Sequence, residues 1–274
     1  MRLSICLLVA CLAHSAPSSA ADVNGLQSFD NTERHVVASV AARRNYNVFV
    51  GVPAGYDPAE GRRYPTVYVL DGGELYPLFV SYAHYLRSGE EVPEVIVVGI
   101  AYGTRDWRQG NNRSQDFTAP AARQDHWGGA AAFQRFLADE LMPMIETEYR
   151  SDPAQRILFG QSLGGQFVLH AAQSEPDLFA GYIASNPALH RNLDHFLRPV
   201  ADRTESSTRS KLFVSSATGD EPRFREPALR WMSHWRSVEN TPWQLRAVDL
   251  PDHGHFSAAP IAFRSGLRWI LTGD

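Results

Sequence analysis

Short apolar runs alternate with longer amphipathic segments over most of this 274-residue chain. The apolar runs lie at residues 66–70, 95–100, 157–159, 182–184, 212–215 and 245–248. Strands this short and apolar, with helices between them, are typical of a mostly parallel sheet that is covered on both faces. Two earlier stretches, residues 34–41 and 45–52, alternate partly with the period of a half-buried strand and predict an antiparallel hairpin at the sheet edge. The pattern therefore predicts an α/β fold.

Helical spacing is clearest between residues 130 and 149. One side of that segment carries an apolar stripe made of Phe133, Phe136, Leu137, Leu141 and Ile145. Pro143 lies inside the stripe and is expected to kink the helix or divide it in two. Because no internal repeat or Pro/Ser-rich linker separates two cores, residues 22–274 are expected to form a single domain.

Two segments lack clear periodicity and predict long loops, residues 102–128 and residues 186–210. In a compact domain, loops of this length usually bind something or move. The first segment is the expected wall of a substrate pocket, and the second is expected to complete its rim.

Charge and composition exclude several classes of function. With 44% hydrophobic and 20% charged residues, the chain is neither disordered nor fibrous. Its formal net charge is −4 and its sequence pI is near 6.2, so it offers no basic field to nucleic acid. Composition leaves the oligomeric state open.

The N-terminus has the layout of a secretory signal peptide. Arg2 precedes an apolar stretch at residues 3–12 and a small-residue segment that ends at Ala21, where cleavage is expected. Both cysteines, Cys6 and Cys11, lie in this segment, and residues 8–11 also resemble a lipoprotein processing box that would anchor the protein through Cys11. The prediction is a periplasmic or secreted protein with no transmembrane segment after residue 21, and the lipid anchor is the alternative.

The segment 160–164 reads Gly-Gln-Ser-Leu-Gly, follows an apolar strand-like run and opens a helix-like stretch. A serine on a sharp strand-to-helix turn needs small residues two positions before and after it, so that the backbone can hold the hydroxyl towards a substrate. Ser162 is therefore a candidate nucleophile.

Such a serine needs a histidine base and a carboxylate that orients it, in the chain order Ser, acid, His. His255 follows the last predicted strand and stands near the start of the last helix, so it is preferred as the base over His253. Asp220 and Glu221 follow the strand at 212–215. Asp220 is the first choice for the acid and Glu221 the reserve, while both also suit helix capping.

The spacing of His253 and His255 also suits a pair of metal ligands. No third group of histidine, cysteine or carboxylate at useful spacing accompanies them in the sequence, so neither a metal nor another cofactor is expected.

Acyl transfer also needs backbone N–H donors for the oxyanion of the tetrahedral intermediate. The N–H of Leu163, directly after the candidate nucleophile, is one expected donor. The other is expected from Gly72 and Gly73, which follow an early strand and allow the backbone to approach a substrate closely.

With these residues in place, the chain resembles the putative-esterase family of the α/β-hydrolase superfamily, and within it the siderophore esterases that act on enterobactin, salmochelin or bacillibactin. The resemblance extends from about residue 45 to residue 271 and is carried by segments 64–72, 97–102, 113–120, 136–145, 149–150, 160–165 and 255–257. It implies an α/β-hydrolase fold with helices on both sheet faces, Ser162 as nucleophile and His255 as base. The choice between Asp220 and Glu221 stays open, because family members vary there.

Four residues of the segment 102–128 are candidates for substrate binding. Arg113 and Asp116 either form a salt bridge that pins their own loop or face the pocket, and Arg113 suits an anionic or catecholate group. Trp107 and Trp127 offer faces for an aromatic acyl group.

These residues together predict an exported serine esterase that acts on a small-molecule ester through an acyl-enzyme. The same triad also suits an acyltransferase, a thioesterase or a peptidase. A ligand-binding protein that has lost activity is the alternative of a different class, and the full set of candidate catalytic residues speaks against it.

Overall fold

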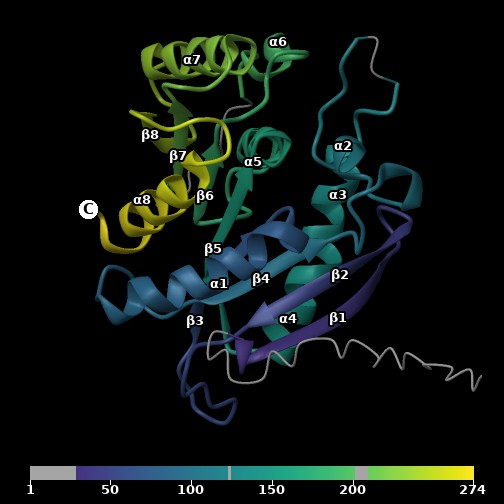
Figure 1. The fold of residues 1–274 in the computed structure, drawn as a ribbon, viewed down its shortest axis with the longest axis vertical. Helices are drawn as coiled ribbons and strands as arrows, with labels where there is room; N and C mark the ends of the chain where they lie inside the picture. The colour runs from purple at the N-terminus through teal and green to yellow at the C-terminus, as the bar shows by residue number, and fades with distance from the viewer. Residues whose placement is uncertain (1–28, 123–124, 201–208) are drawn as a thin grey trace, which may run out of the picture.

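A computed structural model describes residues 29–122, 125–200 and 209–274 of the chain. The predicted signal segment, with Cys6, Cys11 and the expected cleavage after Ala21, lies outside the described residues. Within the described ranges the strands form one eight-stranded sheet in the order β1-β2-β4-β3-β5-β6-β7-β8 (Figure 1). The strands are β1 (Thr32–Ser39), β2 (Arg44–Gly51), β3 (Tyr64–Val69), β4 (Ile96–Ala101), β5 (Ser151–Gln161), β6 (Gly181–Ser185), β7 (Ser210–Ala217) and β8 (Trp243–Leu250).

The sheet is antiparallel at one side and parallel over the rest. β1 pairs antiparallel with β2, and β2 pairs antiparallel with β4, whereas all pairs from β4 to β8 are parallel. The predicted N-terminal hairpin and mostly parallel sheet are therefore confirmed.

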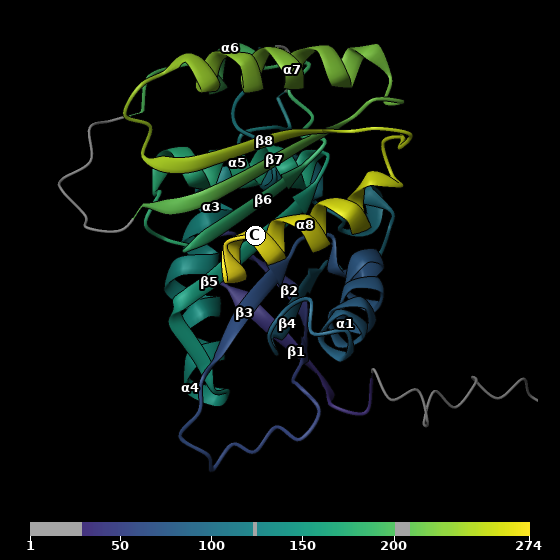
Figure 2. The same ribbon diagram turned by 90° about the vertical axis from the view of Figure 1, so that its left-hand side faces the viewer.

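Helices cover both faces of this sheet, as Figures 1 and 2 show. The helices are α1 (Gly72–Ser88), α2 (Arg113–Asp116), α3 (Ala130–Arg135), α4 (Met142–Glu148), α5 (Leu163–Ser174), α6 (Leu193–Phe196), α7 (Pro222–Ser237) and α8 (Ala258–Thr272), with a short 3-10 turn η2 (Trp107–Gln109). α1 and α8 pack on one face around Phe79 and Phe263, whose stacked rings are 4.2 Å apart. α3, α4, α5 and α7 pack on the other face.

The stripe predicted at residues 130–149 forms one interrupted helix. α3 runs into a π-helical turn, η3 (Phe136–Leu141), and then into α4. Pro143 stands in the first turn of α4 and has no N–H to donate to the preceding turn, which is the physical reason for the interruption. The apolar side chains of the stripe are buried, as their spacing predicts.

The parallel strands β3 to β8 have their carboxyl ends at one edge of the sheet, and the candidate catalytic residues lie at this edge. β5 ends directly before Ser162, and β7 ends three residues before Asp220. Ligands of open α/β sheets bind outside the carboxyl ends of the strands. None of the described helices is both long and apolar enough to cross a membrane.

Candidate active site

Ser162 stands on the sharp turn between β5 and α5. Its φ of 59° and ψ of −114° are a strained conformation for a residue with a side chain. A Cβ at position 160 would lie 2.2 Å from the carbonyl oxygen of Gly164, so only glycine fits there. The Ser162 N–H donates to the Ser185 carbonyl at 3.0 Å, which ties the turn to the end of β6.

His255 and Asp220 meet beside this turn. Nδ1 of His255 lies 2.8 Å from Oδ2 of Asp220, and the Asp220 side chain is only 1% exposed. The second oxygen of Asp220 accepts the Glu221 N–H at 2.7 Å. Glu221 itself points away, with 62% of its side chain exposed and Arg223 as its ion-pair partner at 2.8 Å. Of the two candidate acids, it is Asp220 that contacts the imidazole.

Two loops that carry this pair are joined by backbone hydrogen bonds. The Gly219 N–H donates to the His253 carbonyl at 2.9 Å, and the Thr218 N–H donates to the Leu250 carbonyl at 2.9 Å. The Asp252 N–H donates to the Thr218 hydroxyl at 3.1 Å. The main-chain carbonyl of His253 therefore links the loop after β8 to the loop that carries Asp220.

The N-termini of α1 and α5 meet next to Ser162. A Cβ on Gly164 would lie 3.5 Å from Leu70 and 3.7 Å from the Asp71 carboxylate, so the start of α5 touches the end of β3. Leu163 begins α5 and Gly72 begins α1, and first-turn N–H groups of a helix have no acceptor within it. The two helix ends thus bring backbone donors and positive dipole ends to one place.

Gly72 also has a packing role at this point. A Cβ there would lie 2.5 Å from the backbone nitrogen of Ile100, whereas a Cβ on Gly73 would meet only Ala101 at 3.6 Å. Gly72 is therefore required for α1 to lie against β4, and Gly73 has room around it.

Arg113 is paired with Asp71. Its Nε donates to Oδ1 at 2.7 Å and its Nη2 to Oδ2 at 2.8 Å, a bidentate contact across 42 residues. The predicted alternative of a salt bridge between Arg113 and Asp116 is wrong. Asp71 has a left-handed backbone, with φ 55°, directly before Gly72, so Arg113 braces the loop that precedes α1.

Asp116 is a structural carboxylate. It is 2% exposed, accepts hydrogen bonds from Tyr46 at 2.7 Å and Tyr102 at 3.0 Å, and pairs with Arg44 at 3.1 Å. Burial raises its pKa, and the hydrogen bonds and Arg44 counteract that rise. The expectation that Asp116 faces a substrate is therefore wrong, because its three partners occupy the carboxylate within the protein.

Residues 39–260 match the protein family described as putative esterase. The chain belongs to that family. The ferri-bacillibactin esterase BesA of Bacillus subtilis is 28% identical over 265 residues, which cover 89% of this chain and 90% of that protein. The apo-salmochelin esterase of Escherichia coli is 31% identical over 173 residues, 59% of this chain and 52% of the other.

Solved structures are similar to this chain in their fold. The crystal structure of a BES protein from Bacillus cereus superposes with a TM-score of 0.77 at 24% identity, covering 88% of this chain and 95% of that chain. The predicted α/β-hydrolase fold and the resemblance to siderophore esterases are both confirmed, and the protein is an esterase.

A hollow of about 580 Å³ lies beside Arg113 in this esterase. It is lined by residues of the predicted binding segment: Arg105, Trp107, Asn111, Asn112, Arg113, Ser114, Gln115 and His126. Trp107 is 69% exposed, and the Arg108 guanidinium lies 5.0 Å from its ring. An exposed indole beside arginine side chains suits an anionic aromatic group.

A series of side-chain contacts extends from His255 through four further residues, and three of them were not predicted. The Phe224 ring lies 4.8 Å from the His255 ring, and His190 packs edge-on against Phe224 at 5.0 Å. The Arg191 Nε donates to the His190 Nε2 at 3.2 Å, and its guanidinium lies 6.0 Å from the ring of Trp127, the predicted member. Burial and the charges of Arg191 and Arg223 lower the pKa of His190, so its ring is neutral near pH 7.

For His190 and Arg191 the sequence signal was the unpatterned segment at 186–210, and for Phe224 there was none, because no motif marks a residue that packs on the loop of His255. We call His190, Arg191, Phe224 and Trp127 the aromatic rim.

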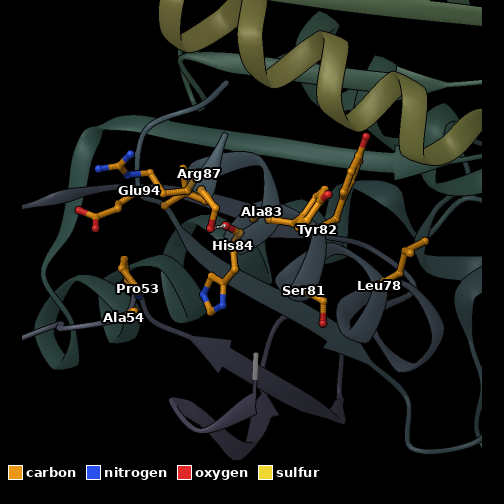
Figure 3. A pocket seen from close by; sticks show the side chains of 12 residues that line it. Pro53, Ala54, Leu78, Ser81, Tyr82, Ala83, His84, Arg87 and Glu94 are labelled. Carbon is orange, nitrogen blue, oxygen red and sulfur yellow. Dashed lines mark hydrogen bonds between the residues drawn. The ribbon is translucent and has the colours of Figure 1, made fainter. Parts of the chain in front are cut away.

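A larger hollow of about 690 Å³ lies elsewhere (Figure 3). It is lined by the exposed side of α1, including Ser81 and His84, by Pro53 and Ala54 after β2, and by Glu94 and Val95 before β4. It contains none of the residues around Ser162, and the start of β4 lies at the opposite edge of the sheet from the strand ends.

Within the described ranges, no group of three or more His, Cys, Asp or Glu side chains could hold a metal ion.

Proposed function

We propose that this esterase is an exported serine hydrolase that cleaves carboxylic esters through an acyl-enzyme. Ser162 is the nucleophile, His255 the general base and then the acid, and Asp220 the residue that orients His255. The observation that carries the proposal is the 2.8 Å contact between His255 and the buried Asp220, beside a serine on a strained turn.

The reaction follows from the hydrogen-bonding roles of these groups. The Nδ1–H of His255 donates to Asp220, so Nε2 is free to take the Ser162 proton as the hydroxyl oxygen bonds to the ester carbon. The carbonyl electron pair moves onto the oxygen, where the N–H groups of Leu163 and of Gly72 or Gly73 bind the negative charge. When the ester C–O bond breaks, Nε2 returns the proton to the leaving alcohol, and a water repeats the sequence to release the acid.

For the substrate, we propose an ester of the siderophore trilactone type or another aromatic or acyl ester. The names of the relatives, a ferri-bacillibactin esterase and an apo-salmochelin esterase, support this class. Arginine and aromatic side chains in the hollow beside Arg113 and in the aromatic rim support it independently, because they suit anionic rings. The signal-like N-terminus supports export to the periplasm or the medium.

Labelling with a fluorophosphonate probe tests the reaction. The wild-type protein should be modified at Ser162, and Ser162→Ala should be unlabelled and inactive on a short p-nitrophenyl ester. His255→Ala should lose turnover by a factor on the order of 10³ or more. His253→Ala is the matched control and should retain most activity, since His253 contributes its main chain. Unlabelled wild-type protein would instead favour a ligand-binding protein.

Product analysis tests the substrate and the kind of transfer. The panel should contain ferric and iron-free catecholate siderophores, other aromatic esters and aliphatic esters, each with and without an added alcohol acceptor. Release of free acid under all conditions supports a hydrolase, and an acylated acceptor would identify an acyltransferase. N-terminal sequencing of the exported protein, beside a Cys11→Ala variant, tests cleavage after Ala21 against a lipid anchor.

A further inference from the structure

The backbone carbonyl of His255 accepts hydrogen bonds from two side-chain amides. One donor is Nε2 of Gln161, and the other is Nδ2 of Asn186 at 3.1 Å. Both amide residues are buried. Together with Asp220 at the ring, they hold the histidine at both its main chain and its imidazole.

Asn186 joins the ends of three elements. Its Oδ1 accepts the Ala217 N–H at 2.8 Å, and its own N–H donates to the Ser215 carbonyl at 2.9 Å. A backbone N–H can only donate and a carbonyl can only accept, so the orientation of the Asn186 amide is fixed. Its φ of 41° is a left-handed conformation that asparagine adopts more readily than most residues.

Gln161 connects the histidine to the nucleophile. It is the last residue of β5 and directly precedes Ser162. A donor from this position fixes the His255 main chain relative to the turn that carries Ser162. Among the described residues, Gln161 Oε1 has no hydrogen-bond partner, so its buried amide serves the structure through the donor end.

We propose that Gln161 and Asn186 are positioning residues that set the distance between the His255 imidazole and the Ser162 hydroxyl. We call them the amide clamp. This inference rests on the proposed function, because Gln161 and Asn186 contact His255 and can affect the reaction only if His255 is the general base. His255 lies in a loop, and a loop residue that moves protons must be held to a fraction of an ångström, because a shift of about 1 Å can cost about 10²-fold in rate.

The first test is Asn186→Asp. The aspartate is the same size, tolerates the left-handed backbone and still accepts the Ala217 N–H, but it places a second acceptor against the His255 carbonyl. We expect kcat for a p-nitrophenyl ester to fall about 10- to 100-fold while KM stays nearly constant. The rate of labelling of Ser162 by a fluorophosphonate should fall by the same factor, because it depends on the same base.

The second variant, Gln161→Met, keeps an uncharged side chain of similar length and removes only the donor, since Oε1 of Gln161 has no partner among the described residues. It should show the same loss of kcat at nearly unchanged KM. Asn192→Asp is the matched control, because Asn192 is a buried amide that donates to Ala119 and Gln166 and does not contact the His255 loop. It should lower Tm and leave kcat close to that of the wild type.

The outcomes separate the clamp from a general effect on the fold. The proposed role of the amide clamp is wrong if Asn186→Asp and Gln161→Met fold and keep the wild-type kcat. It is also wrong if they lose no more of kcat than Asn192→Asp does at the same Tm. If wild-type Ser162 is not labelled at all, the proposed function fails instead.

Discussion

Nδ1 of His255 lies 2.8 Å from Oδ2 of Asp220, and the other oxygen of this buried carboxylate is held by the Glu221 N–H. Asp220→Asn should therefore lower kcat/KM by a factor on the order of 10³, since an amide leaves the wrong tautomer of His255 favoured. Glu221→Gln, one residue away and exposed, should change it little. Steady-state kinetics on one p-nitrophenyl ester measures both, and equal losses would contradict the assignment of Asp220.

Arg113 is expected to affect turnover in two ways, by holding Asp71 in place before Gly72 and by lining the hollow. Arg113→Lys keeps the charge but cannot form the bidentate contact with Asp71, so the loop before Gly72 loses its brace. We expect kcat to fall on the order of 10-fold, about 1.4 kcal/mol of barrier, even for a small neutral ester. Arg105→Lys, in the same hollow but not paired with Asp71, is the control. An effect limited to KM for anionic esters would show that Arg113 acts on substrate alone.

The aromatic rim should set selectivity for charge. Among the described residues, no carboxylate pairs with Arg191, and its side chain contacts His190 and the ring of Trp127. Arg191→Gln should reduce kcat/KM for an aromatic ester that carries an anionic group by about 2- to 5-fold, and leave a neutral aromatic ester unchanged. The difference should shrink at high salt. Equal effects on both esters would assign Arg191 to packing.

His170 should make stability depend on pH. Burial, aided by the neighbouring His195, lowers its pKa to about 4 from the usual 6.5. The unfolded chain therefore binds more protons between pH 6.5 and pH 4, so the free energy of unfolding falls as pH drops through this window, by on the order of 2–3 kcal/mol from this residue. His170→Gln should flatten the curve. Urea unfolding at several pH values measures it, and an unchanged slope in the variant would contradict the prediction.

The parts of the site that local chemistry determines could be predicted from sequence. The turn at Ser162 needs Gly160 and a helix after it, and these stand next to it in the chain. His255 and Asp220 follow strands, so their order along the chain already indicated one sheet edge. The strands and the division of the helix at Pro143 followed from periodicity and from the missing N–H of proline.

Contacts across the fold were beyond such reasoning. The partner of Arg113 was sought three residues away in Asp116, whereas the bidentate contact is with Asp71, 42 residues earlier. The partners of Asp116 are Arg44 and Tyr46 on β2 and Tyr102 directly after β4. Phe224 and His190 gave no signal, because ring packing on a catalytic loop depends on where α7 and the loop after β6 meet in space.

The contact between the start of α5 and the end of β3 has a practical consequence for altering the enzyme. The proposed donors for the oxyanion lie at the starts of α1 and α5, next to the sheet, whereas the hollow beside Trp107 and the aromatic rim belong mainly to the loops after β4 and β6. Loop segments from relatives with other preferences can thus be grafted onto this framework, and a chimera that keeps residues 70–73 and 160–165 should hydrolyse new esters with the original chemistry intact.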